Sequence, residues 1–134
     1  MEIIKIMVCA FFMVALLSGA KAQDAKALLG KWETVYKDKE GTAHITYEFV
    51  NENGQLLCYT RYIADEGGNG SEYNTLAMKN IHFKAGTGKA LFMYKADKEV
   101  YELKASLELE GTNALQVSYS YWGYSDTEQW KKVQ

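Results

Sequence analysis

The side chains that most often act in acid–base and nucleophilic catalysis are scarce in this sequence. Its two histidines, His44 and His82, each lie in a short alternating segment, "HITYEFV" and "NIHFK". Nucleophilic catalysis needs a nucleophile, a base and a group that orients the base, all converging in space. Neither histidine has such partners in its segment. We therefore predict that neither is catalytic and that the protein is not an enzyme.

Metal-ligating and phosphate-binding patterns are equally weak. His44 and Glu48 share one strand face, which supplies two ligands where a zinc site requires three or four. Asp65 and Glu66 precede a glycine-rich stretch, but their spacing does not match an EF-hand loop. Residues 67–70 are not followed by the Gly-Lys-Ser/Thr of a phosphate loop. We therefore expect no metal and no cofactor.

Tyrosine is the residue type that best suits a binding site in this chain. The sequence has ten tyrosines, against five phenylalanines and three tryptophans. Several alternate along strand-like segments with apolar neighbours, and Arg61 shares a strand face with Tyr59. An interior that combines phenols with a guanidinium suits an amphipathic or aromatic ligand better than a plain fatty chain. The residues predicted to line such an interior are Tyr47, Tyr59, Arg61, Tyr101, Tyr119 and Tyr121.

Two alternatives stay open for the aromatic residues. Small barrels are commonly filled by side chains, so the tyrosines would then pack in a core and point their hydroxyls to its rims. Separately, "SYSYWGYSD" places Trp122 and Tyr124 around Gly123 at the end of a strand. Exposed aromatic groups of this kind stack on sugars or anchor a protein partner. This pair is a candidate surface patch.

The elements that must position these side chains are β-strands. "VYELKASLELE" alternates apolar and polar residues along its whole length, as a strand with one dry face does. Asn53-Gly54 is a strong hairpin signal, a bend is expected near Asn80, and residues 64–74 are expected to form a glycine-rich loop. The predicted strands cover residues 31–37, 44–50, 55–63, 75–84, 90–95, 100–110, 114–122 and 127–133.

This succession of short strands predicts an all-β fold. An antiparallel up-and-down barrel of about eight strands is the simplest closure, because it removes exposed strand edges. A two-sheet sandwich is the alternative. Residues 24–29 are expected to form no more than one helical turn before the first strand.

The N-terminus has the layout of a secretory signal peptide. Lys5 is followed by an apolar run over residues 6–17 and by the small-residue ending Ala20-Lys21-Ala22, so cleavage is expected after Ala22. The run is shorter than the roughly 20 residues of a transmembrane helix. We therefore expect residues 1–22 to be removed and residues 23–134 to form one exported domain, periplasmic or extracellular, without stable membrane insertion.

Charge and cysteine content narrow the classes of partner. The formal net charge is −2, which gives no electrostatic reason to expect a nucleic acid. Removal of Cys9 with the signal leaves Cys58 as the one cysteine, so the mature fold has no internal disulfide. Because Cys58 lies in an apolar strand, we expect a buried and inert thiol.

The start and the end of the mature chain resemble a known family. Leu28, Gly30 and Trp32 form an "L-x-G-x-W" pattern after a short helical turn, and the chain closes with "WKKV". In this respect it is similar to lipocalins, of the calycin group, and to small secreted lipocalin-like bacterial proteins of a domain-of-unknown-function family. The resemblance implies that Gly30 and Trp32 stand at the closed base of a barrel. It also implies that a C-terminal basic residue, Lys132 by its strand face, packs across the indole.

The sequence departs from lipocalins in three places. No Thr-Asp-Tyr-like triplet is present, the basic residue is a lysine in place of arginine, and no helix follows the last strand. The leading hypothesis is a non-catalytic exported protein that holds a small, partly hydrophobic or aromatic ligand. A protein- or glycan-interaction module with a filled core is the second, and an enzyme of unknown reaction the third. The oligomeric state is left open.

Overall fold

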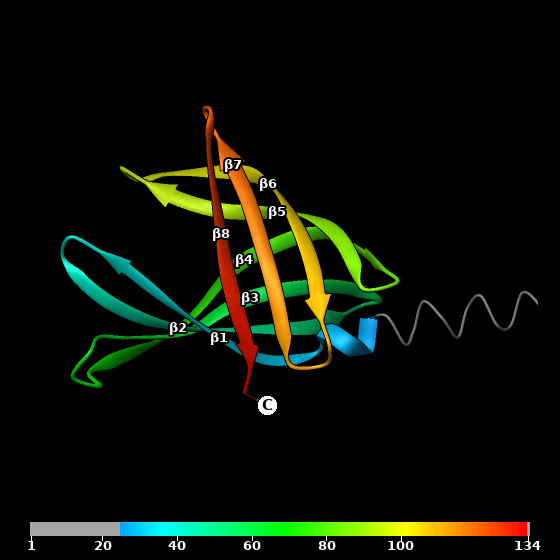
Figure 1. The fold of residues 1–134 in the computed structure, drawn as a ribbon, viewed down its shortest axis with the longest axis horizontal. Coiled ribbons are helices and arrows are strands. Elements are labelled where there is room, and N and C mark those ends of the chain that lie inside the picture. Colours follow the sequence, from blue (N-terminus) through cyan, green and yellow to red (C-terminus); the bar gives the residue numbers. More distant parts are fainter. Residues whose placement is uncertain (1–24, 134) are drawn as a thin grey trace, which may run out of the picture.

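The computed structural model describes residues 25–133, which form eight consecutive antiparallel strands after a helical turn at residues 25–28 (Figure 1). The signal peptide predicted over residues 1–22 lies outside the described residues. Within residues 25–133, no helix has the length and apolar character needed to cross a bilayer. The strands are β1 (Gly30–Asp38), β2 (Gly41–Glu52), β3 (Gln55–Ala64), β4 (Gly70–Lys84), β5 (Thr87–Ala96), β6 (Glu99–Glu110), β7 (Ala114–Tyr121) and β8 (Tyr124–Lys132).

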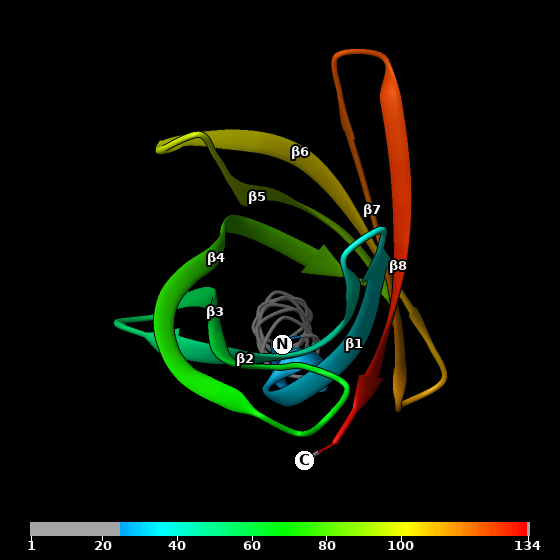
Figure 2. The same ribbon diagram turned by 90° about the vertical axis from the view of Figure 1, so that its left-hand side faces the viewer.

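Each strand pairs with its neighbours in the chain, and β8 pairs with β1 to close the barrel. The prediction of an antiparallel up-and-down barrel is confirmed, and the two-sheet sandwich is wrong. Closure at this last seam is short, because β1 and β8 pair only at Trp32–Lys132 and Glu33–Lys131. Beyond these pairs the two strands separate, and the β1–β2 and β7–β8 hairpins point in different directions (Figures 1 and 2).

A second seam is also short. The pairing of β4 with β5 runs from the turn only as far as Met78 and Phe92, although β4 begins at Gly70 and β5 continues to Ala96. Both short seams lie toward the same end of the barrel. The strands β1–β4 and β5–β8 are therefore joined at that end and spread apart at the other.

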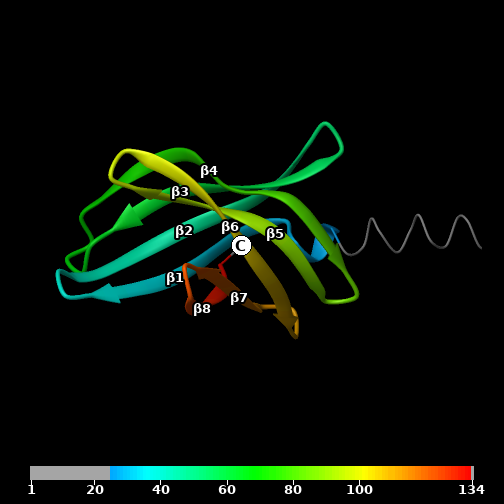
Figure 3. The same ribbon diagram turned by 90° about the horizontal axis from the view of Figure 1, so that it is seen from above.

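The two ends of the barrel are here called the base and the mouth. The base holds the helical turn and the turns after β2, β4 and β6, and the mouth holds the turns after β1, β3, β5 and β7 (Figures 1 and 3). Because turns alternate between ends in an up-and-down barrel, residues early in odd strands and late in even strands meet at the base.

The strand faces follow the predicted alternation. In β6, Leu103, Ala105 and Leu107 are buried, while the residues between them are exposed. The interior of the base is filled by large side chains that are almost fully buried. These are Leu28, Trp32, Phe49, Cys58, Met78, Leu107, Leu115, Val117 and Trp130.

The turns agree with the sequence signals at two predicted positions. Asn53 and Gly54 have φ angles of 54° and 80°, as a type I′ hairpin turn requires. Asn80 has a φ of 52°, and the β4–β5 register shifts between Lys79 and His82. The predicted bend near Asn80 is therefore present as a bulge.

Three turn predictions were wrong. The turn expected at residues 86–89 is shorter, because β5 begins at Thr87, which pairs with Lys84. The loop expected over residues 64–74 covers only residues 65–69, because Gly70 and Ser71 already pair with Ala64 and Ile63. Glycines that suggested a flexible loop are in part strand residues. The last hairpin turns at Trp122 and Gly123, so Tyr124 begins β8 and residues 124–126 are strand instead of turn.

Candidate functional site

The base of the barrel is organised around Trp32. Its side chain is fully buried, and its Nε1 donates a hydrogen bond of 2.8 Å to the carbonyl oxygen of Leu28 in the helical turn. The Lys132 Nζ lies 5.3 Å from the centroid of the indole and 3.4 Å from the carbonyl oxygen of Ala27. Gly30, with a φ of 115°, links the helical turn to β1. Buried side chains therefore pack this end of the barrel.

The mouth contains a cavity of about 340 Å³ between the two spread halves of the barrel. This volume is at the lower end of the range for small-molecule sites. Strands β1 and β2 contribute one wall, and β5 to β8 contribute the other. The lining residues are Tyr36, Ile45, Tyr47, Phe92, Met93, Tyr94, Lys95, Leu103, Tyr119, Tyr121, Asp126 and Glu128.

Aromatic rings form the floor of this mouth cavity. Tyr47 stacks on Trp130, with ring centroids 4.1 Å apart and an interplanar angle of 4°. Phe92 meets Tyr119 edge to face at 5.1 Å, and it also meets the rings of Tyr47 and Trp130 nearly at right angles. Stacked and edge-to-face pairs hold one another in place beyond the effect of their buried area. The floor is therefore preformed.

Two carboxylates of β8 face the same cavity. Glu128 accepts hydrogen bonds from the Tyr119 hydroxyl at 2.7 Å and from the Trp130 Nε1 at 2.9 Å. Asp126 lies one step closer to the mouth, with its Oδ2 3.4 Å from the same Tyr119 hydroxyl. Burial and the hydrogen bond to Glu128 raise the pKa of Tyr119 well above its ordinary value, and burial does the same to the pKa of Tyr47.

The rim of the mouth carries further aromatic groups. Tyr94 and Tyr121 stack at 5.7 Å, while Trp122 meets Tyr101 edge to face at 5.1 Å. The Tyr101 hydroxyl donates to Glu99 at 2.8 Å. Trp122 and Tyr124 are 72% and 70% exposed. This pair, expected as a separate surface patch, is thus continuous with the rim of the mouth cavity.

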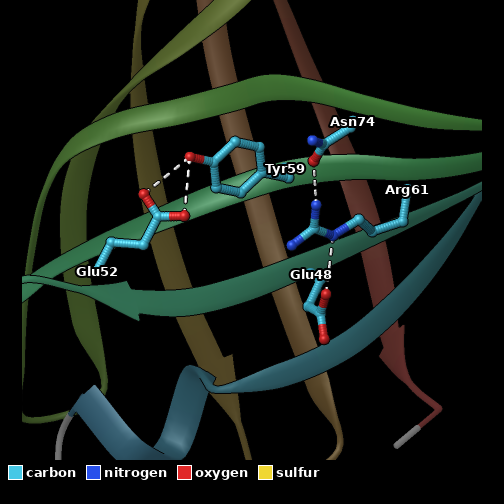
Figure 4. Close-up of polar contacts among 5 residues, drawn as sticks. All are labelled: Glu48, Glu52, Tyr59, Arg61 and Asn74. Atoms are coloured by element: carbon cyan, nitrogen blue, oxygen red, sulfur yellow. Dashed lines mark hydrogen bonds and ion pairs between the residues drawn. The ribbon is translucent and has the colours of Figure 1, made fainter.

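Tyr59 and Arg61, expected in the interior, lie on the outer face of the barrel (Figure 4). Arg61 Nε donates to Glu48 at 2.8 Å, its Nη1 bonds Asn74, and its guanidinium lies 4.7 Å from the Tyr59 ring centroid. The Tyr59 hydroxyl donates to Glu52 on the surface.

Strand parity explains this correction. Cys58 is completely buried and occupies the inward position, so its neighbour Tyr59 must point outward. The segment "LLCYTRYI" has apolar residues at both parities, so its pattern does not say which set is buried. Arg61 has the same parity as Tyr59, so it points outward as well.

The carboxylates were the residues that the sequence interpretation missed. Asp126 was assigned to a turn, and Glu128 was read only as part of a closing strand. A signal existed, because Tyr124, Asp126, Glu128 and Trp130 share one parity. The buried Trp130 identifies that parity as inward. Of the six residues expected in the interior, Tyr47, Tyr119 and Tyr121 line the cavity, and Tyr101 stands at its rim.

The groups considered for catalysis stay apart from this cavity. His44 Nδ1 is 3.5 Å from Glu33 on the outer surface, and His82 is exposed. The Cys58 thiol is completely buried, and that burial raises its pKa. Among residues 25–133, no group of three or more His, Cys, Asp or Glu side chains is arranged to hold a metal ion.

Two larger hollows adjoin the mouth cavity and share some of its lining, Asp126 in both cases. One of about 700 Å³ follows the open part of the seam between β1 and β8. Another of about 590 Å³ runs over β5 to β8 and is lined largely by serine, threonine and lysine. Both are more open to solvent than the mouth cavity, which alone combines enclosure with aromatic walls. The mouth cavity is therefore the candidate site.

Comparison with known proteins yields no match for this chain among protein-family models, curated proteins or solved structures.

Proposed function

We propose that this protein is a non-catalytic binding protein that holds a small, partly hydrophobic or aromatic ligand at the mouth of its barrel. The observation that carries the proposal is the cavity of about 340 Å³ with a preformed aromatic floor. Side chains fill the base, so the room for a ligand inside the described part of the barrel lies toward the mouth. The predicted signal peptide supports export to the periplasm or the exterior, where a carrier would meet its ligand.

A neutral dye tests this proposal without reference to ligand charge. N-phenyl-1-naphthylamine fluoresces more strongly in apolar surroundings, and we expect it to bind saturably with one site per chain. Ile45→Trp would fill the cavity and abolish that binding. Val100→Trp introduces the same side chain at a position that is 58% exposed on β6, so it is the control. Thermal unfolding checks that both variants fold.

Two results would overturn the ligand-carrier proposal. One is a wild-type titration without saturation, and the other is an equal response from Ile45→Trp and Val100→Trp. Native mass spectrometry of protein purified from its own host gives an independent measurement. A carried ligand appears there as a discrete added mass that is released on denaturation.

A second candidate function rests on the exposure of Trp122 and Tyr124. These side chains are 72% and 70% exposed, which is unusual for a tryptophan and a tyrosine in contact with other rings. They favour a protein- or glycan-interaction surface at the rim. Glycan binding that is lost in Trp122→Ala, while dye binding persists, would support this second function.

A further inference from the structure

The charges around the mouth cavity are unbalanced. Asp126 and Glu128 both line it, and neither forms an ion pair within the described chain, where the three ion pairs join Glu33 to His44, Glu48 to Arg61 and Lys79 to Glu102. Glu128 is half-buried and accepts two hydrogen bonds, while Asp126 is exposed, so both carboxylates stay ionised and give this side of the cavity a negative charge.

The basic residues near the site do not balance that charge. Arg61, expected in the interior, forms its bonds on the outer face. Lys95 contributes to the lining but is exposed, and it pairs across strands with Val100, which is also exposed. Its neighbour Tyr94 takes the inward parity. Lys37 and Lys131 line the neighbouring hollow beside the same two carboxylates, but no ion pair in the described chain joins any of these three lysines to Asp126 or Glu128.

A buried hydroxyl in the cavity also lacks a partner. Tyr47 is only 6% exposed, it lines the cavity, and its hydroxyl forms no hydrogen bond with other described residues. Every side-chain oxygen that is sealed from solvent in the described chain has a hydrogen-bond partner. The Tyr47 hydroxyl has none, so it is not sealed and must open into the cavity. A tyrosine oxygen there can accept a hydrogen bond from a ligand.

The walls have the chemistry that attracts a cation. Tyr36, Tyr47, Tyr94, Tyr119 and Tyr121 all line the cavity. Aromatic faces carry negative charge density and attract ammonium groups within about 6 Å, most strongly where water is excluded. An anionic ligand would meet the same faces and two carboxylates of its own sign.

We propose that the ligand is cationic: an ammonium or quaternary ammonium group on an apolar or aromatic body. The charged group lies beside Asp126 and Glu128, and the body lies against the ring floor. This inference rests on the proposed function, since it names the ligand class of the same cavity. Asp126 is the more available contact, because both oxygens of Glu128 already accept hydrogen bonds from Tyr119 and Trp130.

Three probes of one shape and different charge test the inference. They are 3-phenylpropylammonium, 3-phenylpropanol and 3-phenylpropanoate, titrated into the purified protein by calorimetry at pH 7 and low salt. We expect the ammonium to bind at least about tenfold more tightly than the alcohol, and the carboxylate to bind most weakly. The preference for the ammonium should shrink as salt is added.

Variants locate the source of the preference. Asp126→Asn and Glu128→Gln should each reduce the affinity for the ammonium severalfold and leave that for the alcohol nearly unchanged. Glu108→Gln removes an exposed carboxylate from β6, on the opposite face of its strand from Leu107, and should change neither affinity. Should Glu128→Gln fail to fold, Asp126→Asn provides the same comparison at a more exposed site.

The outcomes separate this inference from the proposed function. Equal binding of all three probes, or tightest binding of the carboxylate, overturns the cationic ligand and leaves a ligand-binding cavity. A charge preference that Asp126→Asn and Glu128→Gln do not reduce also overturns it. Absence of binding by all three probes and by the neutral dye overturns both.

Discussion

Glu128 shows how single residues arrange the mouth cavity. Its two oxygens accept hydrogen bonds from Tyr119 and Trp130, the same two rings that pack against Phe92. One carboxylate thus fixes the orientation of two aromatic side chains. Hydrogen bonds to charged groups are the stronger kind, so this arrangement is rigid as well as polar.

The raised pKa of Tyr119 predicts that the free energy of unfolding falls at alkaline pH. The pKa of Tyr119 is raised in the folded state, so the unfolded chain releases this proton first once the pH exceeds about 10. The contribution is complete below about pH 10 and is lost as the pH rises further. In Tyr119→Phe, the free energy of unfolding should therefore fall less steeply as the pH rises above about 10.

Denaturant titrations at several pH values measure that slope. Tyr73→Phe, at an exposed tyrosine, is the control and should keep the wild-type slope. Tyr119→Phe should also be about 1–3 kcal/mol less stable at pH 7, because it loses the hydrogen bond to Glu128. An unchanged alkaline slope in Tyr119→Phe would contradict the prediction.

Trp32 is expected to matter for stability and not for binding. It is fully buried at the base, on the far side of the packed core from the mouth. Trp32→Ala should lower the free energy of unfolding by about 3–5 kcal/mol, while Trp122→Ala, at a surface ring, should change it by about 0.5 kcal/mol or less.

Trp32→Phe separates folding from function if the alanine variant does not fold. It keeps an aromatic ring but loses the hydrogen bond from Nε1 to Leu28. We expect it to be less stable than wild type and to bind the neutral dye with unchanged affinity. Weaker dye binding by a folded Trp32→Phe protein would place Trp32 in the binding machinery.

At the scale of elements, the β4–β5 hairpin lets the two halves of the barrel spread apart at the mouth, because its two strands pair only near the base. Gly88 in β5 is opposite Phe83 in β4, and a Cβ atom at Gly88 would lie 2.9 Å from the Phe83 Cα and closer still to the His82 carbonyl oxygen. Both contacts are with backbone atoms, which cannot turn aside as a side chain can.

Glycine substitutions test the importance of this close approach. Gly88→Ala should lower the free energy of unfolding by about 2 kcal/mol or more, since the hairpin must shift to accommodate the methyl group. Gly54→Ala should cost about 1 kcal/mol, because its φ of 80° is strained for alanine although the space around it is open. Equal losses in the two variants would show that β4 and β5 are not closely packed at Gly88.

At the scale of the whole molecule, the barrel is a packed base and an open mouth. The two short seams join strands β1–β4 to β5–β8 near the base and let them spread beyond it. Buried side chains concentrate where the seams are paired. The cavity exists because the two halves do not meet at the mouth.

Amide hydrogen exchange should show that the packed base is more stable than the open mouth. Amides of Leu115 and Val117 in the buried part of β7 should exchange much more slowly than those of Ser120 and Tyr121 at its mouth end, because local opening needs less burial to be lost there. Saturation with the neutral dye should slow exchange at the mouth only. Uniform exchange along β7 would contradict a separate packed base.

The sequence by itself determined the all-β architecture, the approximate number of strands and most of their turns. Alternation in "VYELKASLELE", the Asn53-Gly54 turn and the bend at Asn80 depend on backbone preferences and local periodicity, so they can be read locally. The same is true of which residues face inward in those strands whose apolar and polar residues alternate.

Tertiary structure alone decided which side chains meet at the mouth. Parity is ambiguous in "LLCYTRYI", where both faces are apolar, so only the packing of Cys58 in the assembled core places Tyr59 and Arg61 outside. Asp126 and Glu128 meet Tyr119 through the local β7–β8 hairpin, but they reach the rings of β2 and β5 only because the barrel closes. Closure depends on pairings between strands far apart in the sequence, which no local pattern encodes.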